Sequence, residues 1–575
     1  MPVHNADIAA VFEEIAELLE IQGENPFRIR AYHNAARELL SLGVPAADMV
    51  AQGDDLTELP AIGKDLAAKI TEIVASGHCR TLDRLRRQLP AAITELLKIP
   101  GLGPKRVRAL YQQLHIGNPD ELARAARAGR IRELSGFGEK TEAAILNALR
   151  TQATAERRFK LAIAAQYAEP LREFLAAIPG VQHAVIAGSY RRCQETVGDI
   201  DLLVTAGNSA PVMDRFVGYD EVALVLAKGP TRASVRLKCG LQVDLRVVEE
   251  ASFGAALHYF TGSKAHNIAI RKLGQNKKLK INEYGVFRGE KRISGKTEAE
   301  IYRAVGLPYI EPELREDTGE IEAARKGKLP TLIALADLKG DLHSHTRASD
   351  GHHTLKEMAQ AARQAGLEYL AITEHSQRLT VAHGLDVQRL RQQCDEIDRL
   401  NESLQGITLL KGIEVDILED GALDLPDEVL AELDLVAAAV HSHFHLSQRQ
   451  QTERILRAMD HRHFSILAHP GGRLIGAREA YDVDMLRIIR HARERKCFLE
   501  LNAHPDRLDL TDNHCRLAKE EKVLIAIGSD AHSIQDFAHL RYGVGQARRG
   551  WLEKGDVLNT RSLRLLRPLL RRTMK

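Results

Sequence analysis

Short apolar runs that end in a histidine or an acidic residue recur along the last 237 residues, which contain 17 of the chain's 24 histidines. Each run has four to seven residues rich in Val, Ile, Leu and Ala, as expected for buried parallel strands. Stretches such as 354–366 and 386–405 lie between the runs and predict helices. Strands and helices therefore alternate, which is typical of a parallel α/β fold.

The ends of these runs predict a metal site. The carboxyl ends of all strands in a parallel barrel open on one face, so side chains at those ends converge. Six of seven run ends supply His, Asp or Glu, and the remaining run, KCFLELN, ends at Asn502. The converging groups are His343, His345, Asp350, His375, Glu414, His441, His469, Asp530 and His532.

The donor types narrow the metal and the chemistry. Imidazoles and carboxylates without thiolates suit zinc, manganese or iron. Nine donors are too many for one ion and suit two or three. A single histidine at a strand end is usually structural, but chance does not explain the same residue types at six of seven ends. Clustered divalent ions activate water for phosphate displacement, so this region predicts a phosphoester hydrolase.

The same motifs resemble the polymerase-and-histidinol-phosphatase (PHP) metallohydrolase family over residues 339–575. The resemblance implies a distorted (βα)7 barrel in which the nine groups are the ligands of two or three Zn²⁺, Mn²⁺ or Fe ions. Five nearby histidines are expected to lie behind the ligands or on the surface. They are His352, His353, His443, His445 and His504.

Composition excludes several classes of protein. The 80 basic and 78 acidic residues give a formal charge of +2, so contacts with nucleic acid must come from local patches. The six cysteines form no CxxC pair, as expected in a reducing compartment. The chain begins with an amphipathic helix and has no apolar run of 18 residues, which predicts a cytoplasmic protein without a membrane span.

The first 150 residues predict helices only, with a hairpin repeated at 59–70, 99–110 and 134–145. In each copy a glycine turn leads into a helix that is expected to start with Lys and to offer its free N–H groups to a phosphate. Three such helix–hairpin–helix units predict binding to a DNA backbone, although one copy alone could be ordinary helix packing. Ala61 replaces the first glycine of the first copy. The predicted DNA contacts are Gly63, Lys64, Gly101, Gly103, Lys105, Gly136, Gly138 and Lys140.

The middle of the chain carries a second set of acidic residues. In AVIAGSYRRCQETVGDIDLLV (184–204), Asp199 and Asp201 lie on one face of a predicted strand, and Asp244 lies on another strand. Three carboxylates on adjacent strands suit two Mg²⁺ or Mn²⁺ ions. The turn before them, with Gly188, Ser189, Arg191 and Arg192, could hold a triphosphate. The alternative is a hairpin with incidental acids, but unpaired charges flanked by apolar residues are costly.

This pattern resembles the nucleotidyltransferase superfamily, and YFTGSKAHN, RKLGQNKKLKI and INEYGVF narrow the resemblance to family X DNA polymerases over residues 1–315. The resemblance implies that Asp199, Asp201 and Asp244 are catalytic. It implies a template contact for Arg271 and, in the N-terminal domain, a Schiff-base lyase role for Lys69. Cys193 stands where the family usually has Gly. The implied nucleotide contacts are Arg158, Gly188, Ser189, Arg192, Gly198, Tyr259, Phe260, Gly262 and Asn267.

Together the resemblances predict a multi-domain α+β and α/β protein, with the bacterial arrangement in which a family X polymerase is joined to a PHP domain. The expected parts are a lyase-like helical domain at 1–80, helix–hairpin–helix fingers at 81–150, a mixed-sheet palm at 151–232, the palm end and thumb at 233–315, a linker at 316–338 and the PHP domain at 339–575.

The expected activity is Mg²⁺-dependent filling of short gaps in base excision repair, with 3′–5′ exonuclease, 3′-phosphatase or abasic-site endonuclease activity in the PHP domain. The expected partners are gapped or nicked duplex DNA and deoxynucleoside triphosphates, bound by a monomer. In the alternative hypothesis the PHP domain is only a metal-stabilised structural module. The basic C-terminal segment RSLRLLRPLLRRTMK is expected to be a closing helix and not a DNA-binding arm.

Overall fold

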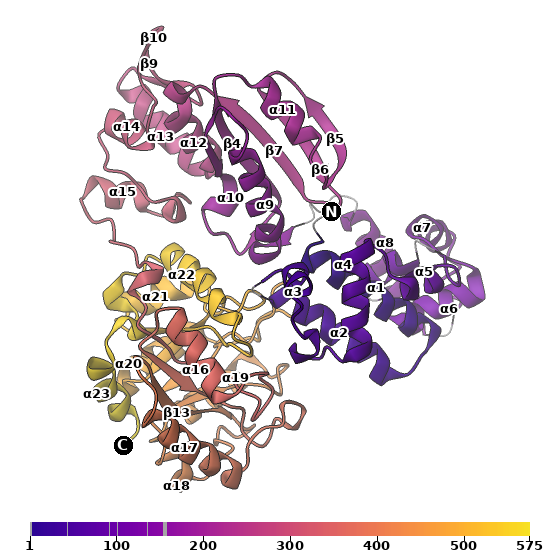
Figure 1. Ribbon diagram of the computed structural model, residues 1–575, viewed down its shortest axis with the longest axis vertical. Helices are drawn as coiled ribbons and strands as arrows, with labels where there is room; N and C mark the ends of the chain where they lie inside the picture. The colour runs from indigo at the N-terminus through magenta and orange to yellow at the C-terminus, as the bar shows by residue number, and fades with distance from the viewer. Residues whose placement is uncertain (1–2, 43, 91–92, 100–101, 135, 153–157) are drawn as a thin grey trace. The chain divides into compact units, whose positions relative to one another are not determined.

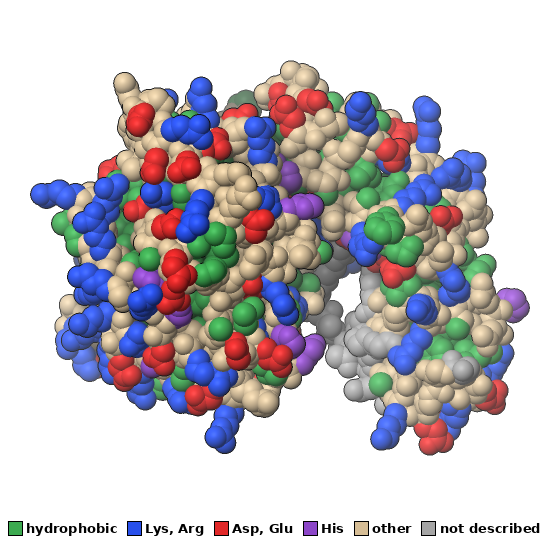
Figure 2. Space-filling model, turned by 90° about the horizontal axis from the view of Figure 1, so that it is seen from below, with side chains coloured by type: hydrophobic (Ala, Val, Ile, Leu, Met, Phe, Trp, Pro, Cys, Tyr) green, Lys and Arg blue, Asp and Glu red, His purple; other side chains and the backbone are tan. Residues whose placement is uncertain are grey.

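The computed structural model describes residues 3–42, 44–90, 93–99, 102–134, 136–152 and 158–575. They form two compact units, Met1–Arg158 and Phe159–Lys575 (Figure 1). Acidic and basic side chains are interspersed over the face seen in Figure 2, in keeping with the formal charge of +2. Among the described residues, no helix is both long enough and apolar enough to cross a membrane.

The first unit contains helices and no strands among its described residues, as predicted. Its long first helix buries Ile8, Phe12, Ile15 and Leu19, which recur at helical spacing along one face. The Phe12 ring meets Tyr32 edge to face at 5.6 Å. The helices are α1 (Asn5–Gln22), α2 (Pro26–Ser41), α3 (Ala46–Gln52), α4 (Lys64–Ser76), α5 (Arg80–Arg86), α6 (Pro104–Leu114), α7 (Pro119–Arg127) and α8 (Glu139–Gln152).

The three repeated hairpins lead into α4, α6 and α8. Only α4 begins at a lysine, Lys64, so the expectation of a leading lysine is wrong for the other two, which begin at Pro104 and Glu139. Proline and an acidic residue both suit the first helical turn. Ala61 has φ +52°, the left-handed conformation that Gly136 adopts with φ +86° at the matching position of the third hairpin. Alanine therefore keeps the turn but adds backbone strain.

The second unit starts with a small ribbon and a five-stranded mixed sheet. The ribbon pairs β1 (Phe159–Lys160) with β3 (Thr196–Val197). The sheet has the order β2-β4-β7-β6-β5, with β4 and β7 parallel and the other pairs antiparallel. Its strands and packed helices are β2 (Val181–Ile186), β4 (Asp199–Ala206), β5 (Val222–Lys228), β6 (Arg232–Leu237), β7 (Gln242–Val248), α9 (Leu161–Ala176) and α11 (Ala210–Val217).

The predicted thumb follows as three helices and a small antiparallel sheet. The predicted linker is not an extended connection, because its helix α15 (Glu320–Arg325) packs on the thumb. Glu320 Oε1 lies 2.6 Å from Nδ1 of His266, and both side chains are fully buried. The thumb elements are α12 (Phe253–Thr261), α13 (Lys264–Asn276), β8 (Lys280–Asn282), β9 (Gly285–Arg288), β10 (Lys291–Ser294) and α14 (Glu298–Val305).

The C-terminal part is a parallel barrel of seven strands in sequential order, β11 to β17. A parallel bridge between Ser344 and Ala531 joins the ends of the first and last strands, so the sheet is nearly closed. This arrangement confirms the predicted (βα)7 barrel. The strands are β11 (Gly340–Asp341), β12 (Tyr369–Ile372), β13 (Thr408–Asp416), β14 (Leu435–Ala439), β15 (Ile466–Leu467), β16 (Phe498–Asn502) and β17 (Ile525–Gly528).

Helices surround these strands (Figure 1). Several begin at side-chain caps, such as Thr354, which forms a capping box with Glu357, and Ser447, which forms one with Gln450. Leu566 and Leu570 of the last helix join the apolar cluster of the barrel interior, which agrees with the predicted closing helix. The helices are α16 (Leu355–Gln364), α17 (Val387–Asn401), α18 (Asp427–Leu430), α19 (Gln448–Met459), α20 (Met485–Arg495), α21 (Asp512–Glu520), α22 (Leu540–Arg549) and α23 (Leu563–Thr573).

Candidate metal centre and polymerase site

The carboxyl ends of the barrel strands bring together all nine side chains predicted to bind metal. Parallel, buried strands deliver the residues that follow them to the same end of the barrel. The nine are His343, His345 and Asp350 after β11, His375 after β12, Glu414 in β13, His441 after β14, His469 after β15, and Asp530 and His532 after β17.

Glu414 lies at the centre of the cluster. Its Oε2 is 2.8 Å from Nδ1 of His375 and 3.4 Å from Nε2 of His343. Its Oε1 is 2.7 Å from Nε2 of His469 and 3.2 Å from Nε2 of His441. The residue is only 1% exposed, so its charge is shielded from water. A buried carboxylate surrounded by four imidazoles is suited to help hold cations.

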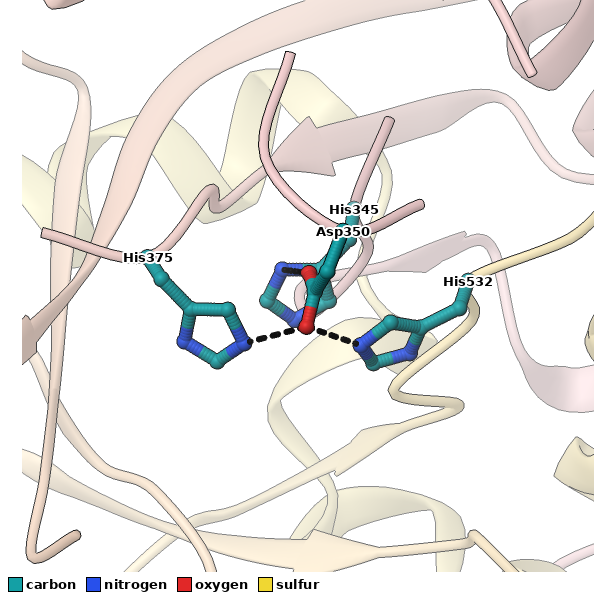
Figure 3. A group of neighbouring side chains, drawn as sticks. All are labelled: His345, Asp350, His375 and His532. Atoms are coloured by element: carbon teal, nitrogen blue, oxygen red, sulfur yellow. Dashed lines mark ion pairs between the residues drawn. The ribbon is translucent and has the colours of Figure 1, made fainter. Parts of the chain in front are cut away.

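Asp350 organises a second part of the cluster. Its Oδ2 lies 3.3 Å from Nε2 of His375 and 3.5 Å from Nε2 of His532. Figure 3 shows the carboxylate between these two rings, with His345 beside them. His345 in turn faces Asp530, with 3.2 Å between Nε2 and Oδ1. The two parts of the cluster are therefore continuous.

Three overlapping groups of these donors could each hold a cation within the fully described barrel. In each group, one donor atom per residue lies within 4.8 Å of the others. Two imidazoles belong to two groups each, so the three positions are adjacent. The groups are His345, Asp350, His375 and His532; His343, His345 and Asp530; and His375, Glu414 and His441.

Buried polar atoms without hydrogen bonds indicate that this space fits cations. Within the described chain, Nε2 of His343, both ring nitrogens of His345, Nδ1 of His375 and Oε2 of Glu414 lie close to other donors but form no hydrogen bond of acceptable geometry. Each buried unpaired polar atom costs about 1–3 kcal/mol, and these five converge. Metal coordination would satisfy them, and the donor types fit zinc, manganese or iron.

The pKa values in the cluster reflect the same shortage of positive charge. Burial opposes protonation of His343, but nearby carboxylates, Glu500 foremost, raise its pKa well above the usual value. Burial also opposes ionisation of Glu414, yet the surrounding imidazoles hold its pKa well below the usual range. Burial and neighbouring imidazoles lower the pKa of His345 to about 3. The ionised carboxylates therefore attract positive charge, which either protons or metal ions can supply.

Two carboxylates that were not among the predicted residues hold two of the candidate ligand rings from behind. Glu500 Oε1 lies 2.6 Å from Nδ1 of His343, and Asp416 Oδ1 lies 2.7 Å from Nδ1 of His441. Such contacts fix the ring orientation and leave Nε2 for the cluster. The sequence did contain a sign of the role of Asp416. This residue lies two positions after Glu414 and therefore shares its face of β13.

The five nearby histidines that were predicted to lie behind the ligands or on the surface belong to none of the three donor groups. The exposed ones are His443 and His445. The half-buried ones are His352, His353 and His504.

In the palm, the predicted carboxylates lie on adjacent parallel strands. Asp201 of β4 pairs in register with Asp244 of β7, and Asp199 lies two residues before Asp201 on the same face. Burial, followed by the charges of Asp199 and Asp244, raises the pKa of Asp201 to about 7. Ser234 Oγ and, at 2.9 Å, Gln242 Nε2 donate to the two oxygens of Asp244. This crowding of negative charge fits a site for divalent cations.

The predicted phosphate loop packs closely on these carboxylates. Gly188 opens the short helix α10 (Gly188–Arg191) with φ +63°, and a Cβ there would lie 2.5 Å from Oδ2 of Asp201. Only glycine satisfies both conditions. Ser189 follows in α10, and Gly198 directly precedes β4. Cys193 has φ +52° and packs closely on Gly545 of α22. A Cβ added at Gly545 would lie only 3.1 Å from the Cβ of Cys193.

The two arginines of this loop have different partners. Arg191 pairs through both of its terminal nitrogens with Glu298, at 2.9 and 2.7 Å. Arg192 donates through Nε to Glu316 at 2.9 Å and through Nη1 to the Thr261 carbonyl at 2.5 Å. Glu316 also accepts from Arg549 of the barrel at 3.0 Å. A residue of the predicted linker thus holds the predicted triphosphate contact.

The YFTG segment and the start of α13 come together beside the palm. Asn267 Nδ2 donates to the Tyr259 carbonyl at 2.7 Å, and the guanidinium of Arg271 lies 5.4 Å from the Tyr259 ring centre. Phe260 meets Tyr259 edge to face at 5.1 Å. Gly262 has φ +71° and ends α12, so it turns the chain between these residues.

The remaining predicted residues belong to the first unit. Lys69 Nζ pairs with Asp65 Oδ1 at 2.5 Å, and its side chain is 12% exposed. Arg158 is the last residue of this unit, so it is described apart from the palm. Gly101 lies outside the described residues. At the hairpins, Gly63, Gly103, Gly136 and Gly138 leave open space where a Cβ would project, and Lys64, Lys105 and Lys140 lie in the first turns of α4, α6 and α8.

Four protein-family models match the chain. A helix-hairpin-helix domain matches residues 3–79, and a SAM-like helix-hairpin-helix tandem matches 93–151. The DNA polymerase beta thumb matches 256–316, and the PHP domain matches 341–504.

Curated relatives cover either the whole chain or one of its halves. "DNA polymerase/3′-5′ exonuclease PolX" of Bacillus subtilis (strain 168) is 39% identical over 574 residues, 99% of this chain and 100% of the relative. DNA polymerase lambda of Rattus norvegicus is 27% identical and covers 54% of this chain and 56% of its own length. A probable phosphatase of Thermoanaerobacter sp. (strain X514) is 31% identical and covers 38% of this chain and 89% of its own. With its helix–hairpin–helix domains, polymerase palm and thumb, and C-terminal barrel, the chain belongs to the family X DNA polymerases that carry a PHP domain.

Proposed function

We propose that this polymerase fills short gaps in DNA and also removes nucleotides from 3′ ends at its barrel. The observation that best supports a second activity is the convergence of nine imidazole and carboxylate groups at one end of the barrel, with every predicted position retained. The buried donor atoms that remain unpaired fit bound cations, which the proposed hydrolysis requires.

At the palm, bound Mg²⁺ or Mn²⁺ would supply charge neutralisation for the primer hydroxyl and the triphosphate. Asp199, Asp201 and Asp244 would hold these ions. Ser234 and Gln242 orient the Asp244 oxygens, and Gly188 lets the phosphate loop approach Asp201. Nucleotidyl transfer needs little more than such positioning of charge.

At the barrel, two or three Zn²⁺, Mn²⁺ or Fe ions would supply an activated water when bound. Glu414 and the imidazoles around it would hold them, while Glu500 and Asp416 fix two of the rings. The name of the Bacillus subtilis relative joins a polymerase to a 3′-5′ exonuclease, which favours a phosphodiester substrate. Hydrolysis of a 3′-phosphate or incision at an abasic site uses the same chemistry.

For DNA binding, we propose that the helix–hairpin–helix units hold a gapped or nicked duplex by its backbone. The glycines before α4, α6 and α8 leave open space at the helix N-termini, where N–H groups can meet a phosphate. Binding should be indifferent to base sequence and should weaken with salt. The protein is expected to act as a monomer on this DNA, with deoxynucleoside triphosphates as its other substrate.

Lys69 is a further candidate for lyase chemistry on a 5′-deoxyribose phosphate. Borohydride should trap the chain on an incised abasic duplex, and Lys69→Ala should abolish the adduct. An adduct that persists in the variant would place the nucleophile elsewhere.

A duplex with a short gap and a 5′-labelled primer tests the two main activities together. With Mn²⁺ and nucleotides the primer should lengthen, and without nucleotides it should shorten. Asp244→Ala should abolish extension but leave shortening, whereas His441→Ala should do the reverse.

Each result has a distinct meaning. Loss of both reactions in Asp244→Ala would refute two separate sites. A metal-loaded protein that extends primers but hydrolyses no phosphodiester, 3′-phosphate or abasic site would support the structural-module alternative for the barrel.

A further inference from the structure

A loop of the barrel, residues 503–508 between β16 and α21, contacts the palm and the metal centre at the same time. We call it the bridging loop. Asp506 Oδ1 lies 2.6 Å from Nζ of Lys160 on the palm ribbon. The next residue, Arg507, places Nε 3.5 Å from Oδ2 of Asp530, one of the nine donors. Adjacent side chains thus reach the polymerase half and the hydrolase half of the chain.

A second ion pair holds the bridging loop to the same ribbon. Arg473 pairs with Glu195 of the palm at 2.6 Å, and it also donates to the carbonyls of Arg507 and Leu508 at 2.9 and 2.5 Å. Glu195 precedes β3 directly, and its carbonyl accepts from the backbone N–H of Leu161 at 3.0 Å. Lys160, at the end of β1, and Glu195, directly before β3, are therefore neighbours on one ribbon and hold the loop at two points.

The bridging loop acts on the far oxygen of a metal-binding carboxylate. Asp530 Oδ2 accepts from Asn502 Nδ2 at 2.9 Å and faces Arg507. Its other oxygen, Oδ1, lies 3.2 Å from Nε2 of His345 and 3.5 Å from Nε2 of His343. Holding one oxygen aims the other at the cluster, as contacts behind metal ligands commonly do.

The loop conformation needs support from outside. Leu508 has φ +41°, which is strained for a residue with a side chain. The ion pairs that supply this support are partly shielded from water, with side-chain exposures of 22% and 20% for Lys160 and Asp506, and of 14% and 35% for Arg473 and Glu195. Partly buried pairs are screened less by salt than surface pairs.

We propose that Lys160 and Glu195 of the polymerase palm are positioning residues for the metal centre of the barrel, acting through Arg507 on Asp530. The barrel is then complete as a hydrolase only when the palm ribbon is docked on it. This inference deepens the proposed hydrolytic function and rests on it for its catalytic consequence. Its consequence for metal retention does not depend on which phosphoester is hydrolysed.

The test uses the full chain with Lys160→Met and, separately, Glu195→Gln. The matched control is Lys228→Met, which removes the ion pair between Lys228 Nζ and Asp214 Oδ1 at 2.5 Å. Lys228 lies on β5, the outer strand of the palm sheet, away from the loop. Mn²⁺ loss to a chelator and shortening of a 3′-recessed duplex are measured. In both test variants Mn²⁺ should dissociate about tenfold faster and kcat should fall about tenfold, with KM within twofold. Lys228→Met should match the wild type.

A charge exchange separates positioning from a general loss of folding. The double variant Lys160→Glu with Asp506→Lys restores the ion pair with reversed sign, and it should recover most of the lost metal retention and kcat. Retention and kcat unchanged in both single variants would overturn the inference, as would a double variant no better than Lys160→Met. If the wild type shortened no DNA, the proposed hydrolysis would fail, but faster Mn²⁺ loss in the two variants would still support the positioning role, and unchanged loss would overturn it.

Discussion

Replacement of Glu500 by Gln should lower the metal affinity of the barrel although Glu500 is not itself a proposed metal ligand. Glu500 is 2% exposed and accepts three contacts: from Nδ1 of His343 at 2.6 Å, from the backbone N–H of His469 at 2.8 Å and from Nδ2 of Asn502 at 3.3 Å. Glutamine has nearly the same shape, but one of its two terminal groups is an NH₂ that cannot accept. At least one of the two short contacts must therefore be lost.

The magnitude follows from what those contacts do. Loss of a carboxylate behind a metal-binding imidazole typically lowers metal affinity 10- to 100-fold, or about 1.4–2.8 kcal/mol. The donor left without a partner is buried, which adds about 1–3 kcal/mol of lost folding stability. Because the metal binds only the folded chain, saturating metal should restore part of that stability.

Chelator competition measures the metal affinity, and thermal unfolding with and without Mn²⁺ measures the stability. The control is Asp427→Asn, which alters another His–carboxylate pair of the barrel, His461 Nε2 to Asp427 Oδ1 at 2.8 Å, that is partly exposed and outside the donor groups. Its metal affinity should stay within twofold of the wild type, and primer extension should be unchanged in both variants. A Glu500→Gln protein with wild-type affinity would refute the view that Glu500 orients His343.

Three further predictions concern other parts of the chain. Ala61→Gly should raise the free energy of unfolding of the first unit by about 1 kcal/mol in urea titration, because Ala61 has φ +52°; no gain would mean that the turn is unstrained in solution. Glu316→Gln should raise KM for nucleotides roughly tenfold, or about 1.4 kcal/mol, by releasing the Arg192 guanidinium; an unchanged KM would exclude this role. In the metal-free chain, burial lowers the pKa of His532, but the charge of Asp350 outweighs burial and raises that pKa to about 10. A raised histidine pKa stabilises the fold fully below the unfolded value of 6.5 and loses that effect as pH rises toward 10. Metal-free protein should therefore lose stability between pH 7 and 9, and His532→Gln should lose less; equal losses would contradict this assignment.

Much of the candidate site could be predicted from the sequence because strand ends in a parallel barrel converge whatever the loops do. Nine residues spread from His343 to His532 therefore meet in the structure. Period-2 alternation likewise placed Asp199 and Asp201 on one face of a strand. Repeated glycine turns predicted the helices of the first unit for a similar reason, since each hairpin is a local structure. These predictions depend on chain periodicity and on the direction of the strands.

Tertiary structure decided which side chains support these groups. Three supporting contacts join residues more than 100 positions apart in the chain. They are Glu500 with His343, Glu316 with Arg192, and Lys160 with Asp506 of the bridging loop. No local pattern encodes such pairs, because they depend on packing within the barrel and on how the barrel, the thumb and the palm pack against one another. Local periodicity determined where the candidate donors lie, and tertiary packing determined how those donors are held.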